Sequence, residues 1–489
     1  MHVVRFLLVK PDVDLIIIGA GLSGIGAACH FSINFPEKKY LILESRDNLG
    51  GTWNFFKYPG VRSDSDMHTL GYNFKPWKEK KAIADGSDIF KYIDRTAAEF
   101  QVKENIRYNS KVSSANWETE NKVWTVNFTD SFEKQHRLRS RFVYSCSGYY
   151  SYDEAHMPKF PNIDAFKGRV VHPQFWPSTL DYDNKKITVI GSGATAVTLV
   201  PSLTEKASHV TMLQRSPTYI VSRPAVDKTA KALEKYLPEK TAYKITRWKN
   251  IFASLIFYHI NRAWPIFMKQ KLIDWVRRSM RDAVDVDKHF TPTYNPWDQR
   301  VCMVPNGDLF KCLRNGSASI VTDQIEEFTA EGIKVKSGEH IDADIIITAT
   351  GLKMLPLGGI DMRVDGQGVD ISSTVQYKGV MLSGIPNFFV ASGYTNASWT
   401  LKCDLTSKYV CRLIKYCDSK GYQVCMPRDV GDSEKQVMSV GLTSGYILRS
   451  INKFPKEGLS SPWKLRQNYF LDLIGLRFAA LRNNKMFFS

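Results

Sequence analysis

Two stretches of the chain share one pattern of apolar and glycine positions. Residues 14–28 read DLIIIGAGLSGIGAA, and residues 186–200 read KITVIGSGATAVTLV. In each, a β-branched apolar run precedes glycines and then an apolar stretch typical of a helix. This order predicts a buried strand, a tight turn and a helix, which together open a Rossmann-type dinucleotide-binding domain. Two such units predict two nucleotides held by two domains.

The rest of the chain predicts further strands and one helical segment. Apolar runs around Trp124 and Phe142, and another within residues 339–351, are typical of strands. Residues 228–288 differ, because they carry 14 Lys/Arg, 6 Asp/Glu and many aromatic residues without strand-like alternation. We therefore predict an α/β fold with two Rossmann-like domains and a helical insertion.

The 489 residues suit two or three domains. We expect the first dinucleotide-binding domain to consist of residues 1–150 and 351–489. The second is expected to consist of residues 151–227 and 291–350, with the helical insertion at residues 228–290.

The charge balance favours anionic partners. Lys and Arg number 66 against 49 Asp and Glu, a net charge of +17. Phosphorylated cofactors, nucleic acid or an anionic membrane surface would all suit it. Because no nucleic-acid-binding module is recognisable, we do not predict a nucleic-acid partner.

The eight cysteines form no Cys-x-x-Cys pair, so neither a metal site nor a dithiol relay is predicted. This usage suits a reducing, cytoplasmic compartment. The N-terminal residues 1–10 contain no cleavage site of a signal peptide. The longest apolar run, residues 251–260, is half the length of a membrane span.

The first fingerprint is Gly19-x-Gly21-x-x-Gly24. These glycines permit a tight turn, a close approach of the backbone to a pyrophosphate, and close packing of helix on strand. The phosphate would lie at the helix N-terminus. Glu44 ends the next apolar run, where a carboxylate can accept hydrogen bonds from an adenosine ribose.

The second fingerprint is Gly191-x-Gly193-x-x-Ala196. Arg215 and Ser216 occupy the place that Glu44 has in the first unit. A carboxylate would repel a 2′-phosphate, whereas a guanidinium can bind one through two hydrogen bonds. The second site is therefore predicted to prefer NADPH to NADH, unless Arg215 is only a solvated surface charge.

The link between the two units carries the strongest motif. Phe166, Gly168, His172, Trp176 and Pro177 match F-x-G-x-x-x-H-x-x-x-W-P, the fingerprint of type I Baeyer–Villiger monooxygenases. The stretches GGTWNFFKYPGVRSDSD, YNPWDQR and GYTNASWTLK also resemble this family, in its ethionamide-activating branch. The resemblance covers roughly residues 12–475.

This resemblance implies FAD in the first site, NADPH in the second, and a C4a-peroxyflavin that inserts one oxygen atom of O2 into a ketone. It also implies oxygenation of thioamides or thioethers. Arg300 matches the family's active-site arginine, which stabilises negative charge. Asp64 matches the aspartate that orients this arginine, although P-G-x-x-S-D is also typical of a turn. A structural ion pair is the alternative for Arg300.

Other residues receive positions by the same resemblance. Trp53 and Tyr58 are expected near the isoalloxazine, and Asn396 and Trp399 near the substrate. His172 is expected to transmit cofactor binding between the domains, and not to act as a base.

Three alternatives stay open from the sequence. One is an N- or S-oxygenating flavoprotein without ketone oxidation, and another is a flavin-binding protein without oxygenation. The third concerns residues 228–288, which either narrow a substrate channel or contact an anionic membrane peripherally.

Overall fold

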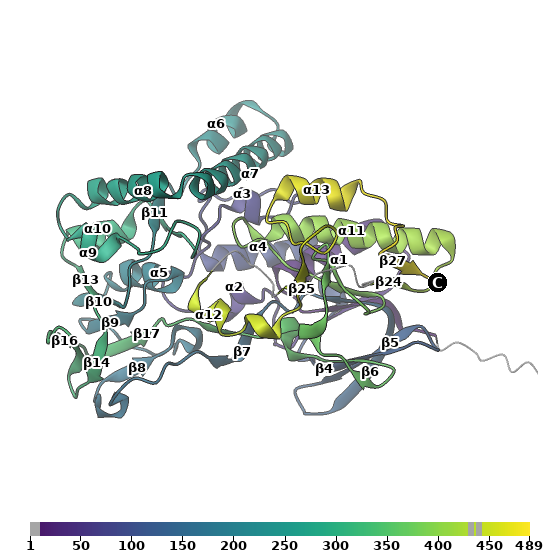
Figure 1. Ribbon diagram of the computed structural model, residues 1–489, viewed down its shortest axis with the longest axis horizontal. Coiled ribbons are helices and arrows are strands. Elements are labelled where there is room, and N and C mark those ends of the chain that lie inside the picture. The colour runs from purple at the N-terminus through teal and green to yellow at the C-terminus, as the bar shows by residue number, and fades with distance from the viewer. Residues whose placement is uncertain (1–9, 429–434, 437–442) are drawn as a thin grey trace, which may run out of the picture.

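The computed structural model describes residues 10–428, 435–436 and 443–489. Residues 1–9 lie outside the described residues, and they make up most of the N-terminal segment in which the sequence predicts no signal peptide. Two α/β units lie side by side, and strand β7 (Tyr150–Ala155) runs between them (Figure 1). β7 pairs with β18 (Leu352–Met354), so the chain passes between the units along two antiparallel strands.

The first unit is built around β1 (Val13–Ile18). This strand pairs in parallel with β2 (Tyr40–Leu43) and β6 (Gln135–Ser145), as its buried apolar run predicts. The parallel part of the sheet ends at β3 (Ile106–Arg107) on one side and β23 (Phe388–Val390) on the other. Further strands complete the sheet: β4 (Lys111–Glu118), β5 (Val123–Thr129), β19 (Asp361–Val364), β20 (Gln367–Gly368), β21 (Gln376–Tyr377) and β22 (Met381–Leu382).

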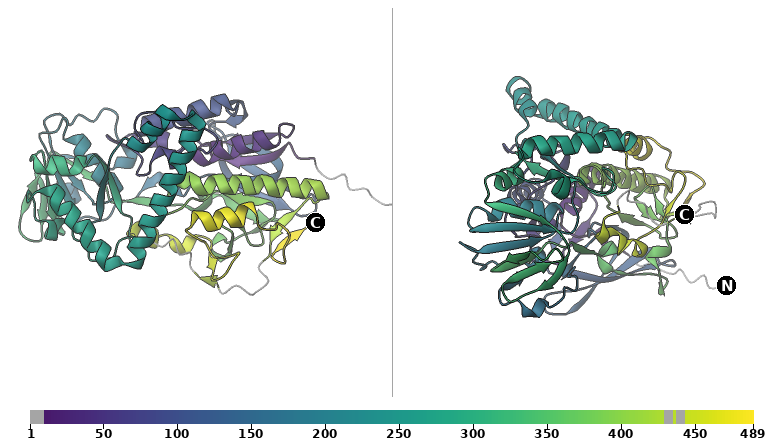
Figure 2. Two further views of the ribbon diagram at one scale, coloured as in Figure 1. Left: turned by 90° about the horizontal axis from the view of Figure 1, so that it is seen from above. Right: turned by 60° about the vertical axis from the view of Figure 1, so that its left-hand side comes forward.

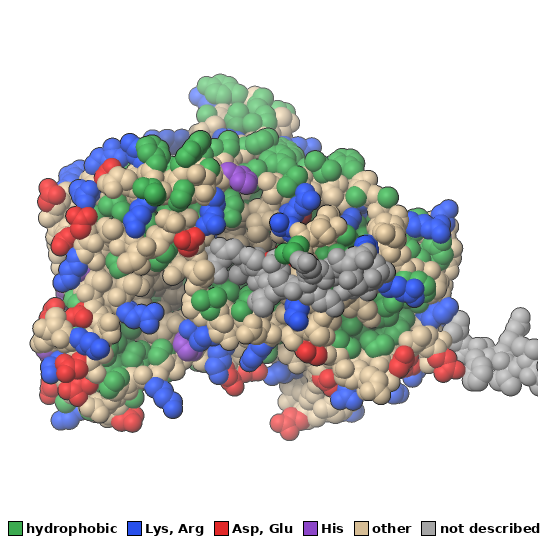
Figure 3. Space-filling model, viewed as in Figure 1, with side chains coloured by type: hydrophobic (Ala, Val, Ile, Leu, Met, Phe, Trp, Pro, Cys, Tyr) green, Lys and Arg blue, Asp and Glu red, His purple; other side chains and the backbone are tan. Residues whose placement is uncertain are grey.

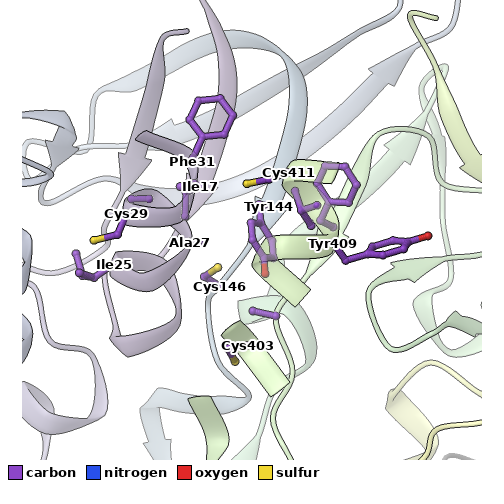
Figure 4. Close-up of a cluster of buried hydrophobic side chains, with 14 of the residues drawn as sticks. Ile17, Ile25, Ala27, Cys29, Phe31, Tyr144, Cys146, Cys403, Tyr409 and Cys411 are labelled. Atoms are coloured by element: carbon purple, nitrogen blue, oxygen red, sulfur yellow. The ribbon is translucent and has the colours of Figure 1, made fainter. Parts of the chain in front are cut away.

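Two long helices, α1 (Leu22–Asn34) and α11 (Trp399–Lys420), pack on each other beside the first sheet. Both helices contribute to one buried core, which contains Ile25 and Phe31 of α1 and Tyr409 and Cys411 of α11 (Figure 4). All eight cysteines are buried and free. Burial raises the pKa of the Cys403 thiol to about 12, so it packs as a neutral side chain.

The second unit has a five-stranded parallel sheet in the order β13-β10-β9-β17-β8. The second fingerprint supplies β9 (Lys186–Ile190) and α5 (Ala194–Leu203). The apolar run predicted within residues 339–351 contains β17 (Ile345–Thr348), which pairs with β9. The other strands are β8 (Arg169–Val171), β10 (His209–Gln214) and β13 (Ala318–Thr322); β14 (Ile325–Phe328), β15 (Gly332–Val335) and β16 (His340–Asp342) form a small antiparallel sheet beside them.

The predicted helical insertion is confirmed. It consists of α6 (Lys228–Tyr236), α7 (Glu239–Ala263), α8 (Pro265–Met280) and α9 (Val286–Phe290). Seen from above, α7 and α8 meet at an angle and cross the molecule (Figure 2). Among the described residues, no helix combines the length and the apolar character that a membrane span requires.

Arg247 of α7 fastens this insertion to the first unit. Its Nη1 donates to the carbonyl oxygens of His68 and Gly71, each at 2.7 Å. Its Nη2 lies 3.3 Å from Asp404 of α11, which also accepts a 3.0 Å hydrogen bond from His30. Because these side chains are buried, the polar network fixes where α7 sits.

The C-terminal part of the chain returns to the first unit. Helix α12 (Gly445–Leu448) contacts β18, and α13 (Tyr469–Arg477) packs on α11. The last strand, β27 (Met486–Phe488), pairs with β24 (Cys425–Pro427). The remaining short elements are α2 (Thr52–Phe55), α3 (Met67–Leu70), α4 (Gly86–Glu99), α10 (Asp308–Arg314), β11 (Ile220–Arg223), β12 (Cys302–Pro305), β25 (Lys435–Gln436) and β26 (Glu457–Gly458).

Candidate active site

A cavity of about 1270 Å³ lies where the two units meet. Both glycine fingerprints line it, as do β7, the start of β18 and helix α12. The two fingerprints, 172 positions apart when Gly19 is compared with Gly191, thus open into the same space. A ligand held at one fingerprint can therefore reach a ligand held at the other.

The first fingerprint is built as its glycines predict. Gly19 has a φ of 97°, and a Cβ there would lie 2.8 Å from the carbonyl oxygen of Cys146. A Cβ at Gly24 would lie 1.9 Å from the carbonyl oxygen of Gly19. Gly21 precedes α1 and places no side chain over its first N–H groups. These free donors and the helix dipole make this end of α1 suited to a phosphate.

Glu44 is buried at the carboxyl end of β2 and lines the cavity. Its carboxylate accepts hydrogen bonds from the backbone N–H of Ala20 at 2.6 Å and of Arg46 at 3.0 Å. Burial raises the pKa of this carboxyl, while these hydrogen bonds work in the opposite direction. Glu44 therefore also holds the glycine turn in place, which the sequence did not indicate.

The second fingerprint has the same construction. Gly191 has a φ of 141°, and a Cβ there would lie 2.5 Å from the carbonyl oxygen of Ala349. Gly193 leaves the first N–H groups of α5 without a side-chain cap. Ala196 is buried on the sheet side of α5, in the place of Gly24 in the first unit. The second unit therefore has room for the methyl group of Ala196, whereas the first unit has no room for one at Gly24.

Arg215 and Ser216 follow β10 and line the cavity. Arg215 is exposed, and among the described residues no carboxylate forms an ion pair with it. The carbonyl oxygen of Ser216 accepts a hydrogen bond from Ser192 at 3.2 Å, which ties this corner to the fingerprint. The guanidinium is thus free to bind an anion beside the second nucleotide position.

Arg300 and Asp64 come together across the cavity. Nη2 of Arg300 lies 2.7 Å from Oδ2 of Asp64, and Nη1 donates to the carbonyl oxygen of Thr395 at 3.2 Å. Asp64 raises the pKa of the Arg300 guanidinium above its ordinary value, which outweighs the effect of burial. Arg300 therefore stays cationic throughout the usable pH range. In the turn that contains Asp64, the neighbouring side chains cap the backbone. Ser63 accepts a hydrogen bond from the N–H of Ser65, and Asp66 accepts one from the N–H of Thr69.

Three tyrosines surround this ion pair and were not singled out by the sequence. Tyr149, Tyr150 and Tyr446 line the cavity and act on the charge of Arg300. Burial raises the pKa of each phenol, so all three stay neutral and can donate hydrogen bonds. The adjacent glycine and two tyrosines after β6, GYY, were the only signal for two of them.

The residues placed near the flavin or the substrate by resemblance divide into two groups. Trp53, Tyr58 and Trp399 line the main cavity, and Trp399 packs 5.0 Å from the ring of Tyr149. Asn396 is not among the described residues that line it. Its amide donates to the carbonyl oxygen of Gln467 at 2.8 Å, beside a separate small cavity under α7. The position of Asn396 beside the substrate stays a prediction.

The residues of the linking motif do not line the cavity. They contact the strands that join the two units. A Cβ at Gly168 would lie 2.3 Å from the carbonyl oxygen of Asp344, and Phe166 packs under this turn. His172 accepts from the N–H of Gln174, whose own amide donates to the carbonyl oxygen of Ser151 in β7 at 3.0 Å. Burial lowers the pKa of His172, which suits a neutral positioning residue. Trp176 and Pro177 follow it, and Trp176 packs edge-on to Tyr182.

Fold and site together define a protein with two dinucleotide-binding units and one shared reaction cavity. Comparison with known proteins narrows this class. The family model "flavin-binding monooxygenase-like" matches residues 14–356. The chain belongs to this family.

Two relatives match this chain over almost its whole length. FAD-containing monooxygenase EthA of Mycobacterium tuberculosis is 50% identical over 477 residues, which covers 95% of this chain and 97% of that protein. Probable FAD-binding monooxygenase AlmA of Acinetobacter baylyi is 47% identical over 482 residues, covering 98% and 97%. The crystal structure of OTEMO in complex with FAD and NADP has a TM-score of 0.69, with 24% identity, and covers 86% of this chain and 88% of that one. That likeness confirms the predicted fold.

Proposed function

We propose that this protein is an FAD- and NADPH-dependent Baeyer–Villiger monooxygenase. It would insert one oxygen atom of O2 between a ketone carbonyl and its neighbouring carbon, giving an ester or lactone. The second oxygen atom leaves as water, and NADPH supplies the two electrons for its reduction. The observation that carries the proposal is the Arg300–Asp64 ion pair inside the cavity shared by both fingerprints.

The residues present fit the two cofactors. The uncapped N-termini of α1 and α5 suit the two diphosphates. Glu44 suits a ribose with free hydroxyls, and the unpaired Arg215 suits the 2′-phosphate of NADPH. FAD, when bound and reduced by NADPH, supplies the activation of O2.

Arg300 would stabilise the negative charge that develops on oxygen during transfer. A guanidinium held at the cavity wall needs no reorganisation at the moment of reaction, and a water-poor site strengthens its effect. Asp64 orients the guanidinium through the 2.7 Å ion pair and keeps it protonated. Trp53, Tyr58 and Trp399 line the cavity with aromatic surface that excludes water.

One substrate that carries both a ketone and a thioether tests this proposal. The FAD-loaded protein is incubated with NADPH, O2 and this substrate, and the products are separated by chromatography and identified by NMR. Ester formation supports the proposal, with or without sulfoxide.

Sulfoxide without any ester over a range of ketone sizes would contradict it and would indicate a heteroatom oxygenase. Loss of NADPH with no oxygenated product from either group would indicate a flavoprotein that does not oxygenate. The Arg300→Ala variant serves as the matched control, because it should lose the ester but keep both cofactors.

A further inference from the structure

A large apolar surface lies on the helical insertion and on α13, and none of its residues lines the main cavity. Ten of the seventeen large hydrophobic side chains that are exposed in the described chain lie on three helices or directly beside their ends. Figure 3 shows hydrophobic side chains gathered along this upper edge of the molecule. We call it the apolar shelf; its members are Ile245, Trp248, Phe252 and Ile256 of α7, Trp264 directly before α8, Ile266 and Phe267 at the start of α8, Leu471 and Ile474 of α13, and Phe478 directly after α13.

The parts of the shelf on α7 and α13 form one surface. Phe470 of α13 lies 4.7 Å from Phe252 and 5.9 Å from Trp248, measured between ring centroids. The other side of α7 is anchored by the buried Arg247 network, so the exposed stripe keeps its direction. Ile266 is 82% exposed and Phe478 67% exposed, and so much exposed apolar surface in one region is uncommon on a monomeric protein.

Positive charges predominate around the shelf. From residue 240 to residue 273 the chain holds seven Lys/Arg and no Asp/Glu. Four of these are engaged elsewhere, because Arg247 is buried, Lys249 pairs with Asp227, Arg262 pairs with Asp298 and Lys269 donates to the carbonyl oxygen of Pro292. Lys240, Lys244 and Lys271 remain exposed, and among the described residues none of them forms an ion pair. On α13, the exposed Arg477 stacks over Phe478.

Apolar and aromatic side chains flanked by lysines suit the surface of an anionic bilayer. The aromatic rings and aliphatic chains would enter the boundary between headgroups and acyl chains, while the ammonium groups meet lipid phosphates. A second copy of this chain fits less well, because a symmetric contact would bring these lysines together without acidic partners.

We propose that the apolar shelf, together with Lys240, Lys244 and Lys271, binds the surface of an anionic phospholipid bilayer. This binding is peripheral. The proposal does not depend on the reaction catalysed in that cavity.

Flotation of the full chain with vesicles tests this proposal. Vesicles of phosphatidylcholine alone are compared with vesicles that also contain phosphatidylglycerol. The protein is expected to float with the anionic vesicles at low ionic strength. Binding should fall several-fold near 1 M salt, where charges are screened beyond about 3 Å.

Two variants separate the apolar and the charged contributions. Phe252→Ser/Ile266→Ser and Lys240→Glu/Lys244→Glu/Lys271→Glu are each expected to reduce the bound fraction by about tenfold or more. The matched controls, Phe132→Ser and Lys134→Glu/Lys167→Glu/Lys336→Glu, change exposed residues that lie outside the helical insertion and α13, and should bind as the wild type does. Equal NADPH oxidation by all forms shows that each is folded.

Three results would overturn the proposal. One is the absence of flotation with anionic vesicles at low ionic strength. Another is equal loss of binding in the control variants. The third is a concentration-dependent dimer, seen by analytical ultracentrifugation, that Phe252→Ser/Ile266→Ser abolishes while vesicles bind neither form. That last result would assign the shelf to a second copy of the chain.

Discussion

At the scale of single residues, Glu44 and Arg215 occupy corresponding corners of the two units and differ in charge. Glu44 is buried and held by backbone N–H groups, whereas Arg215 is exposed and free to bind. The difference lets the two fingerprints hold different nucleotides although their glycines are alike.

The charge of Arg215 leads to a prediction on cofactor choice. Arg215→Ala should raise the KM for NADPH by about tenfold or more, since a charge-assisted contact with the 2′-phosphate is lost. The KM for NADH should change little, because NADH has no phosphate at this position. Steady-state kinetics with both cofactors provides the measurement, with Arg137→Ala as the control. An equal rise for NADH would contradict the assignment of Arg215.

The sequence predicted those residues whose signal is local. Gly19, Gly24 and Gly191 could be placed because a fixed spacing after an apolar run implies one particular turn. Tyr149, Tyr150 and Tyr446 could not, because they approach Arg300 only after distant segments have packed. The motif around Asn396 could not predict the direction of its side chain, which donates to the carbonyl oxygen of Gln467, a residue 71 positions away.

At the scale of elements, the turn before β8 fixes how the linking motif meets the second sheet. Gly168 leaves no room for a side chain between the carbonyl oxygen of Asp344 and the ring of Phe166, which is 2.4 Å from the position of a Cβ. The motif's glycine is therefore a packing requirement at this turn.

Gly168→Ala should accordingly destabilise the protein. The added methyl group must displace backbone or ring atoms, which we expect to cost about 1–3 kcal/mol in the free energy of unfolding. Gly368→Ala is the control, because a Cβ there meets nothing within 4 Å, and it should change stability by less than about 0.5 kcal/mol. Urea unfolding of both variants gives the comparison, and similar stability of the two would refute the packing argument.

At the scale of the whole molecule, the buried network around Asp404 joins the helical insertion to the first unit. Asp404 lies within 3.0 Å of His30 and 3.3 Å of Arg247. Burial raises the pKa of its carboxyl, but the hydrogen bond from His30 and the charge of Arg247 outweigh this and lower the pKa below 3.8. The sequence predicted that the insertion is helical. It could not predict the contact between Arg247 and Asp404, because these residues are more than 150 positions apart.

Asp404→Asn should reduce the free energy of unfolding by about 3–5 kcal/mol near neutral pH, because it leaves a buried Arg247 without its counter-charge. A carboxyl whose pKa is lowered on folding stabilises the protein fully above its unfolded value of 3.8 and loses this effect as the pH falls further. The difference from wild type should therefore stay constant from pH 8 to about 5 and narrow only in more acidic solution. Asp282→Asn, at an exposed position, is the control. A difference that narrows well above pH 5 would contradict this account.

The central claim is that Arg300 acts in oxygen transfer and not in cofactor binding, and one stopped-flow experiment on Arg300→Ala tests it most directly. The FAD-loaded variant is mixed with NADPH without O2 to follow flavin reduction, and then with O2 and a ketone to quantify the ester. We predict reduction within about threefold of the wild-type rate and a loss of ester formation of about 100-fold or more, as when a charge-stabilising donor is removed. Ester formation at the wild-type rate, or a reduction rate that falls as far as the ester yield, would contradict the claim.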